Sequence, residues 1–157
     1  MKKIVRTVCI GVLSGLAFLA ACCSTKGLTR AEKKQLKRDR DSIQEILKMR
    51  EMASVYGSPE IIANYGAETA RLRYELDSIN QRLGEDVDVE TSKRRYELKQ
   101  HIAELKAAVQ YREGACVYGS PEVIERYGAE TDRMIQEIEA LEKELKELDE
   151  LNELNGN

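Results

Sequence analysis

The sequence predicts an all-α protein made of two tandem antiparallel α-hairpins, which form a four-helix bundle or an elongated coiled coil. Three observations predict this fold class. Apolar residues recur at helical spacing along most of the chain after residue 30, one long segment occurs twice, and the 157 residues are 34% charged and 5% aromatic with only two prolines. Such a composition suits long solvated helices better than a β-sheet.

The repeated segment divides the chain into two similar parts. Residues 55–69 recur at 117–131 with 12 of 15 positions identical, and a weaker match extends on both sides, so that Arg50 returns as Arg112. A repeat of this kind indicates one structural unit used twice. We therefore expect a two-helix unit at 30–83 and again at 93–154, followed by a tail at 155–157.

The first helix of each unit has a start signal and an apolar stripe. Thr29 with Glu32 three residues later forms a capping-box pattern at the beginning of the first unit. The apolar residues that come next keep helical rather than strand spacing. In the two units they are Leu36, Ile43, Ile46 and Leu47, and Leu98, Ile102, Leu105 and Val109.

The next segment of each unit predicts a tight turn between two helices. Gly57 and Gly119 suit the position just after a helix, where a left-handed backbone carries no Cβ penalty. Serine, proline and glutamate come next in both copies, as N-cap, first helical residue and first-turn acid. These residues are Ser58, Pro59 and Glu60, and Ser120, Pro121 and Glu122.

The second helix of each unit should run through its internal glycine, Gly66 or Gly128. The apolar residues from Ile62 to Leu83, and their counterparts from Ile124 to Leu148, keep one helical phase across that glycine. Residues 84–92 then separate the units as an acidic linker. Their carboxylates resemble a calcium loop only faintly, because the later glycine and the terminal glutamate are missing, so we expect no metal there.

Two arrangements of the four helices are open. The hairpins can close on each other as an up-down-up-down bundle, or stay open and bury their stripes by oligomerising. Charge favours closure, because the basic start of the first helix would lie beside the acidic end of the fourth. The residues concerned are Arg30, Lys33, Lys34, Lys37 and Arg38, and Glu144, Glu147, Asp149 and Glu150. The basic residues could instead attract anionic lipid head groups.

The N-terminus carries a targeting signal. Basic residues come first, at Lys2, Lys3 and Arg6. The apolar run at 8–21 is 14 residues long, shorter than the roughly 20 that span a membrane. Together these features describe a secretory signal peptide at 1–21.

The end of this segment, Leu19-Ala20-Ala21-Cys22, resembles the lipobox of bacterial lipoproteins. The resemblance implies that Cys22 receives a diacylglyceryl group and becomes the first residue of the mature chain, with 22–29 as a lipidated tether. It also implies a bacterial envelope location. The simpler alternative is an ordinary signal peptide with an incidental cysteine.

The residues after Cys22 bear on which membrane would hold the anchor. Cys23 stands where inner-membrane retention in enteric bacteria uses aspartate, and 24–27 lack an acidic export signal. By the same resemblance, we expect an outer-membrane anchor that faces the periplasm.

Catalytic and nucleic-acid-binding signals are missing from the sequence. His101 is the only histidine, and no nucleophile elbow, Cys/His pair or phosphate loop is present. Loss of the signal peptide moves the formal charge from −3 to −6, which disfavours nucleic acid as a partner. We expect no enzyme activity, no cofactor and no metal site, with Cys116 as a small semi-buried residue and Cys23 free or modified.

These observations favour a non-catalytic, lipid-anchored envelope protein with a structural or adaptor role. Its partners would be membrane lipid through Cys22 and an envelope protein or a second copy of the chain. The antiparallel topology places both turns at the end far from the lipid, which makes them candidate partner-binding residues: Tyr56, Ser58, Glu60, Tyr118, Ser120 and Glu122. The alternative is a ligand-binding or inhibitor module that uses the bundle interior or these turns.

Replacing Cys22 tests the anchor. Cys22→Ala should abolish acylation and move the mature protein out of the membrane pellet, because two or more acyl chains anchor stably whereas one barely does. Metabolic labelling with radioactive palmitate, followed by membrane fractionation, measures both effects. Palmitate in the mature form of the variant would contradict the assignment, and Cys23→Ala is the control that should keep the label.

Overall fold

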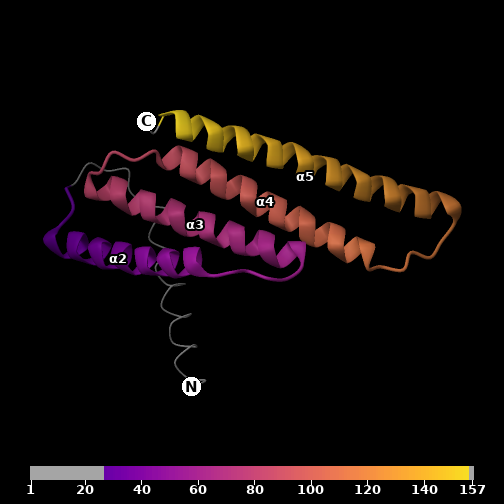
Figure 1. Cartoon of the computed structure of the whole chain (residues 1–157), viewed down its shortest axis with the longest axis horizontal. Coiled ribbons are helices and arrows are strands. Elements are labelled where there is room, and N and C mark those ends of the chain that lie inside the picture. Colours follow the sequence, from indigo (N-terminus) through magenta and orange to yellow (C-terminus); the bar gives the residue numbers. More distant parts are fainter. Residues whose placement is uncertain (1–26, 156–157) are drawn as a thin grey trace, which may run out of the picture. The chain divides into compact units, whose positions relative to one another are not determined.

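The computed structural model describes residues 27–155, with side chains up to Leu151, and contains four α-helices. They are α2 (Arg30–Met52), α3 (Pro59–Leu83), α4 (Val89–Glu113) and α5 (Pro121–Asn155), shown in Figure 1. No strand occurs in residues 27–155, so the all-α prediction is confirmed. The signal peptide and Cys22 lie outside the described residues. Among the helices described, none has the length and apolar character needed to cross a membrane.

The helix starts follow the sequence signals. Glu32 Oε2 accepts the Thr29 backbone N–H at 2.8 Å, and Thr29 Oγ1 accepts the Glu32 N–H at 3.2 Å, so the capping box is confirmed. Ser58 caps α3 by accepting the Ile61 N–H, with Pro59 as the first helical residue. At α5, the Ser120 carbonyl accepts the N–H groups of Val123 and Ile124.

The connection between α3 and α4 is shorter than the expected linker. Gly84 ends α3 in a left-handed conformation with φ of 95°, and the Glu85 N–H bonds back to the Asn80 carbonyl at 2.9 Å, as in a Schellman motif. Asp88 then caps α4 through the Thr91 N–H at 3.0 Å. Residues 89–92 therefore form the first turn of α4 rather than part of a linker. A contact with α3 contributes to this, because Ser92 is buried and donates a hydrogen bond to Asp77 of α3.

Helices α3 and α5 are continuous through Gly66 and Gly128, as predicted. α3 has 25 residues and α5 has 35, so α3 is about 37 Å long at 1.5 Å per residue. A Cβ atom added at Gly66 or Gly128 would meet nothing within 4 Å. Local packing therefore does not require a glycine at either position.

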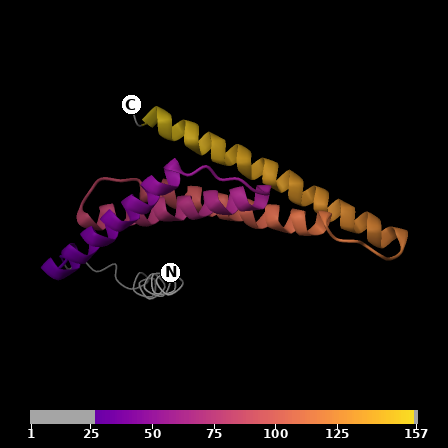
Figure 2. The same cartoon turned by 60° about the horizontal axis from the view of Figure 1, so that its bottom comes forward.

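The closest helix packing joins the two repeats. α3 and α4 run antiparallel on either side of the short connection at 84–88 and approach each other most closely, while α4 also packs against α5 (Figures 1 and 2). Tyr74 of α3 stacks on Tyr96 of α4 with ring centroids 6.2 Å apart. Small side chains permit this close approach, since Ala67 and Ala70 are buried in α3 and Ala103 is buried in α4.

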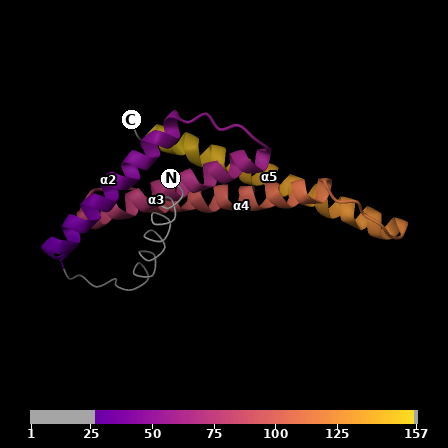
Figure 3. The same cartoon turned by 90° about the horizontal axis from the view of Figure 1, so that it is seen from below.

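Helix α2 is held differently. It makes no close backbone contact with another described helix, and Figures 2 and 3 show it inclined to α3. Leu36 and Leu47 are its buried apolar residues. Near its middle, Arg40 forms an ion pair with Glu85 at 3.2 Å. Near its end, Arg50 hydrogen-bonds to α3, so side chains rather than backbone packing attach α2 to the rest of the molecule.

The expected charge pairing between the first and fourth helices is wrong. Each of the four acidic residues at the end of α5 has another partner. Glu144 pairs with Arg94, and Asp149 with Arg95 at 2.7 Å, both across the α4–α5 contact. Glu147 and Glu150 pair one turn away, with Lys143 and Lys146. The reason is proximity, because α4 is the antiparallel neighbour of α5 and presents its basic residues directly to it.

Two glycine substitutions test this description of the helices. Gly66→Ala should raise the free energy of unfolding by about 1 kcal/mol, because alanine favours a helix interior and its Cβ has free space. Gly84→Ala should lower it by about 1 kcal/mol, because the left-handed conformation strains a Cβ-bearing residue. Urea denaturation of segment 29–157, followed by circular dichroism, measures both. A loss of stability in Gly66→Ala would contradict the open environment of Gly66.

Candidate functional site

An arginine near the end of α2 ties the first turn together. The Arg50 guanidinium lies over the Tyr65 ring, 3.8 Å from its centroid. Its Nε donates to Thr69 Oγ1 at 3.0 Å and its Nη2 donates to the Tyr65 carbonyl at 3.0 Å. In return, the Tyr65 hydroxyl donates to the Arg50 carbonyl at 3.0 Å. We call this set of arginine, tyrosine and threonine the arginine clamp.

The second copy builds the same clamp. Arg112 lies over Tyr127 at 3.7 Å and donates to Thr131 Oγ1 at 2.9 Å and to the Tyr127 carbonyl at 2.8 Å. The Tyr127 hydroxyl donates to the Arg112 carbonyl at 3.4 Å. In both copies a glutamate one residue before the threonine adds an ion pair, at 3.1 Å for Glu68 and 3.0 Å for Glu130.

The clamp explains where the first helix of each unit ends. The carbonyls of the last helical turn lack partners within the helix. The Arg50 carbonyl accepts both the Tyr65 hydroxyl and the Ala53 N–H, the latter at 3.2 Å. The Arg112 carbonyl likewise accepts the Ala115 N–H at 3.2 Å. These bonds tighten the last turn and stop the helix, while cation–π and charge-assisted contacts fix the second helix against it.

The turns are consequently longer than predicted. Because α2 ends at Met52 and α4 at Glu113, Gly57 and Gly119 do not occupy the position just after the helix. Both nevertheless need glycine, because φ is 154° and 158°. A Cβ at Gly57 would lie 3.0 Å from the Ile61 side chain, and one at Gly119 would lie 3.2 Å from Val123. Each glycine therefore lets the next helix pack directly on the turn.

The six candidate residues separate into two groups. The serines and glutamates belong to the helix starts: Ser58 caps α3, and a hydrogen bond from Ser120 lowers the pKa of the Glu122 carboxyl. Tyr56 and Tyr118 have no such role. They are 86% and 88% exposed, so neither ring is buried against its turn.

Each tyrosine is followed within six residues by two exposed aliphatic side chains, in both copies. These stand at matching positions at the start of α3 and of α5, and they are between 39% and 52% exposed. We call these two sets the tip patches: Tyr56, Ile61 and Ile62, and Tyr118, Val123 and Ile124. Because α3 and α4 are antiparallel, the two turns lie at the same end of the α3–α4 pair (Figure 1).

The sequence patterns identify Tyr56, Tyr118 and the repeated arginine, but they do not reveal the clamp. Helical phase assigns Tyr65 and Thr69 to the core, and Arg50 only marks the extent of the repeat. The available signal is the spacing, since an arginine stands 15 residues before a tyrosine and 19 before a threonine in both copies. Only the turn geometry brings these three side chains together.

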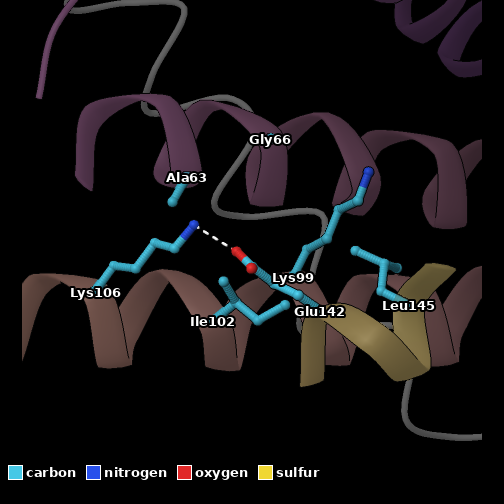
Figure 4. Close-up of a pocket in the computed structure, with 7 residues that line it drawn as sticks. All are labelled: Ala63, Gly66, Lys99, Ile102, Lys106, Glu142 and Leu145. Carbon is cyan, nitrogen blue, oxygen red and sulfur yellow. Dashed lines mark hydrogen bonds and ion pairs between the residues drawn. The ribbon is translucent and has the colours of Figure 1, made fainter. Parts of the chain in front are cut away.

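A hollow lies between α3, α4 and α5 (Figure 4). It is an open depression of ≈ 180 Å³. Lys106 Nζ pairs across it with Glu142 at 2.7 Å, and burial lowers the pKa of the Lys99 ammonium beside it. Its lining contains no tyrosine: Ala63, Gly66, Lys99, Ile102, Lys106, Glu142 and Leu145.

Other candidate groups are dispersed. Cys116 is free and exposed rather than semi-buried, and the His101 ring lies 3.5 Å from Glu137 on the surface of the α4–α5 pair. Within the described residues, no three His, Cys, Asp or Glu side chains come together as a metal site would require. No protein-family model, curated protein or solved structure matches the chain.

Removing the clamp arginines tests their role. Arg50→Met and Arg112→Met should each lower the free energy of unfolding by about 1–3 kcal/mol, because each leaves a carbonyl and a threonine without their charged donor. Arg50→Lys should also destabilise, since lysine lacks the planar fork that bonds two acceptors at once. Urea denaturation provides the measurement. Arg73→Lys, in an exposed ion pair with Glu51, is the control that should change stability by less than about 0.5 kcal/mol; an equal effect would argue against the clamp.

Proposed function

We propose that this chain is a non-catalytic, lipid-anchored protein of the bacterial envelope that acts as a structural or adaptor component and docks partners through its tip patches. The lipobox resemblance at Leu19-Ala20-Ala21-Cys22 supports the anchor. The observation that carries the docking role is the exposure of Tyr56 and Tyr118, which are identical in the two copies and 86% and 88% accessible to solvent.

The fold already explains most of the repeated residues. The clamp accounts for the repetition of Tyr65 and Thr69, and the helix start accounts for Ser58 and Pro59. None of these roles involves Tyr56, whose ring contacts little of the protein. A repeated, exposed aromatic residue beside aliphatic side chains matches the composition of protein-interface anchors. Partner binding therefore explains a repetition that packing leaves without a cause.

The proposal includes a tandem arrangement in which each unit is a hairpin closed by its own clamp. A chain anchored at Cys22 would direct α2 away from the lipid, so that both turns lie at the far end of the helices. Two similar patches at one end suit a partner with two equivalent sites, because linked contacts strengthen each other through a high effective concentration. The described contacts that support this are the clamps at Arg50 and Arg112.

An inhibitor or ligand-binding module is the second candidate, and only the tip version has structural support. The same exposed tyrosines could insert into a groove of another protein. A ligand site in the helical interior has less support, because the hollow between α3, α4 and α5 is open and measures only ≈ 180 Å³, whereas pockets that bury small molecules typically reach about 300 Å³ or more.

Alanine substitution of both tip tyrosines tests the proposal. Tyr56→Ala with Tyr118→Ala should reduce crosslinking to the envelope partner at least about tenfold, since interface aromatic residues often contribute about 2 kcal/mol or more. Membrane anchoring and melting temperature should stay unchanged, because both rings are exposed. Photocrosslinking from position 58 in cells, followed by mass spectrometry, measures capture.

A matched control comes from the same chain. Tyr111 is also exposed, at 79%, but stands where the other copy has Met49, so Tyr111→Ala should leave capture intact. Glu60→Gln with Glu122→Gln should cost only a few tenths of a kcal/mol through the helix dipole. Undiminished capture by the double tyrosine variant would mean that these residues only build the turns.

A further inference from the structure

The contact between α3 and α4 joins the two copies of the repeated unit. The equivalent faces of the other two helices, α5 and α2, are uncovered. The offset of 62 residues converts α3 positions into α5 positions and α4 positions into α2 positions. Tyr74, which stacks on Tyr96, corresponds to Gln136, and Tyr96 corresponds to Lys34. The faces that join the two units internally are therefore repeated, on α5 and on α2, without an occupant.

The uncovered face of α5 is acidic. Glu125, Asp132 and Glu139 are spaced seven residues apart, so they lie in one line along the helix. All three are exposed, and no ion pair or hydrogen bond is found for them within the described residues. The acidic residues on the opposite side of α5, by contrast, are paired with α4: Glu137, Glu142, Glu144 and Asp149.

The uncovered face of α2 is basic. Lys34 and Lys37 are the counterparts of Tyr96 and Lys99, both of which lie where α4 meets α3. Both lysines are exposed and have no partner in the part of the chain that the structure describes. The two uncovered faces thus carry opposite charge.

The centre of the acidic face keeps a small residue of the internal contact. Ala129 corresponds to Ala67, which is buried at 8% exposure. The flanking positions have changed instead, since Ala63 and Ala70 correspond to Glu125 and Asp132. Close helix approach therefore remains possible on α5, while charge replaces the apolar flanks.

We propose that α5 binds α2 of a second copy of this chain, in the register in which α3 binds α4. Gln136 then faces Lys34, because their counterparts Tyr74 and Tyr96 stack on each other. Asp132 lies one turn from Gln136, near the turn of α2 that holds Lys37, and Glu139 lies one turn from Gln136 on the other side. Such a contact is head-to-tail, so it leaves one free α2 and one free α5 and extends into rows or closes into rings. This assembly goes beyond the adaptor role and does not use the tip patches.

Charge reversal on each face tests the assembly. The full chain in detergent should self-associate at about 50 mM salt and dissociate at about 0.5 M, because exposed charges are screened at the higher concentration. Asp132→Lys with Glu139→Lys, or Lys34→Glu with Lys37→Glu, should weaken association at least about tenfold. All four substitutions in one chain should restore it, and the two double variants should associate when mixed. Sedimentation velocity measures each case.

Two further measurements complete the test. Glu104→Lys with Glu113→Lys changes the net charge equally but lies on α4, so it should leave association unchanged. Zero-length crosslinking of a mixture of isotope-labelled and unlabelled wild-type chains should join Lys34 or Lys37 of one copy to Asp132 or Glu139 of another. A monomeric wild-type chain without these crosslinks would overturn the proposal. The proposal would also be overturned if association survived charge reversal on α5 and the lysines of α2 were needed only for binding to phosphatidylglycerol vesicles.

Discussion

The arginine clamp is the interaction on which the arrangement of each unit depends. Arg50 and Arg112 each donate a hydrogen bond to a tyrosine carbonyl of the following helix, α3 or α5. Each also lies over the ring of that tyrosine and bonds a threonine hydroxyl, and so fixes the angle at which the helix leaves the turn. This matters most for α2, which lacks close backbone contact with the other described helices. A planar guanidinium can do this because it bonds two acceptors and stacks on a ring at the same time.

A second constraint is the small core. The buried apolar residues of the described chain are few, and three of them are alanines. Alanine contributes little apolar area but permits helices to approach closely, so α3 and α4 gain stability from a tight contact and from the Tyr74–Tyr96 stack. Surface ion pairs such as Lys106–Glu142 align α5 on α4, although each contributes only about 0–1 kcal/mol.

Duplication has had different consequences for turns and for faces. The turns have kept their clamp, their glycine and their exposed tyrosine, which is expected if both copies share one structural role and one binding role. The faces that join α3 to α4 have diverged from their counterparts on α5 and α2, because those counterparts do not meet within the described chain. Ala70 is buried at 3% exposure, whereas its counterpart Asp132 is exposed. The outer faces are therefore free to carry charge, and the proposed assembly makes use of that charge.

Local sequence signals were enough to predict the helical class, the capping box at Thr29, the start of α3 at Pro59 and the continuity of both long helices, because these depend on interactions within one helix. They also located both turns. Contacts between helices determined the other features. Asp77 and Ser92 extended α4 back to Val89, Arg94 and Arg95 took the acidic partners assigned to α2, and Tyr65 served the clamp while Tyr56 remained exposed. Each of these outcomes joins residues on different helices, and spacing along one helix does not contain that information.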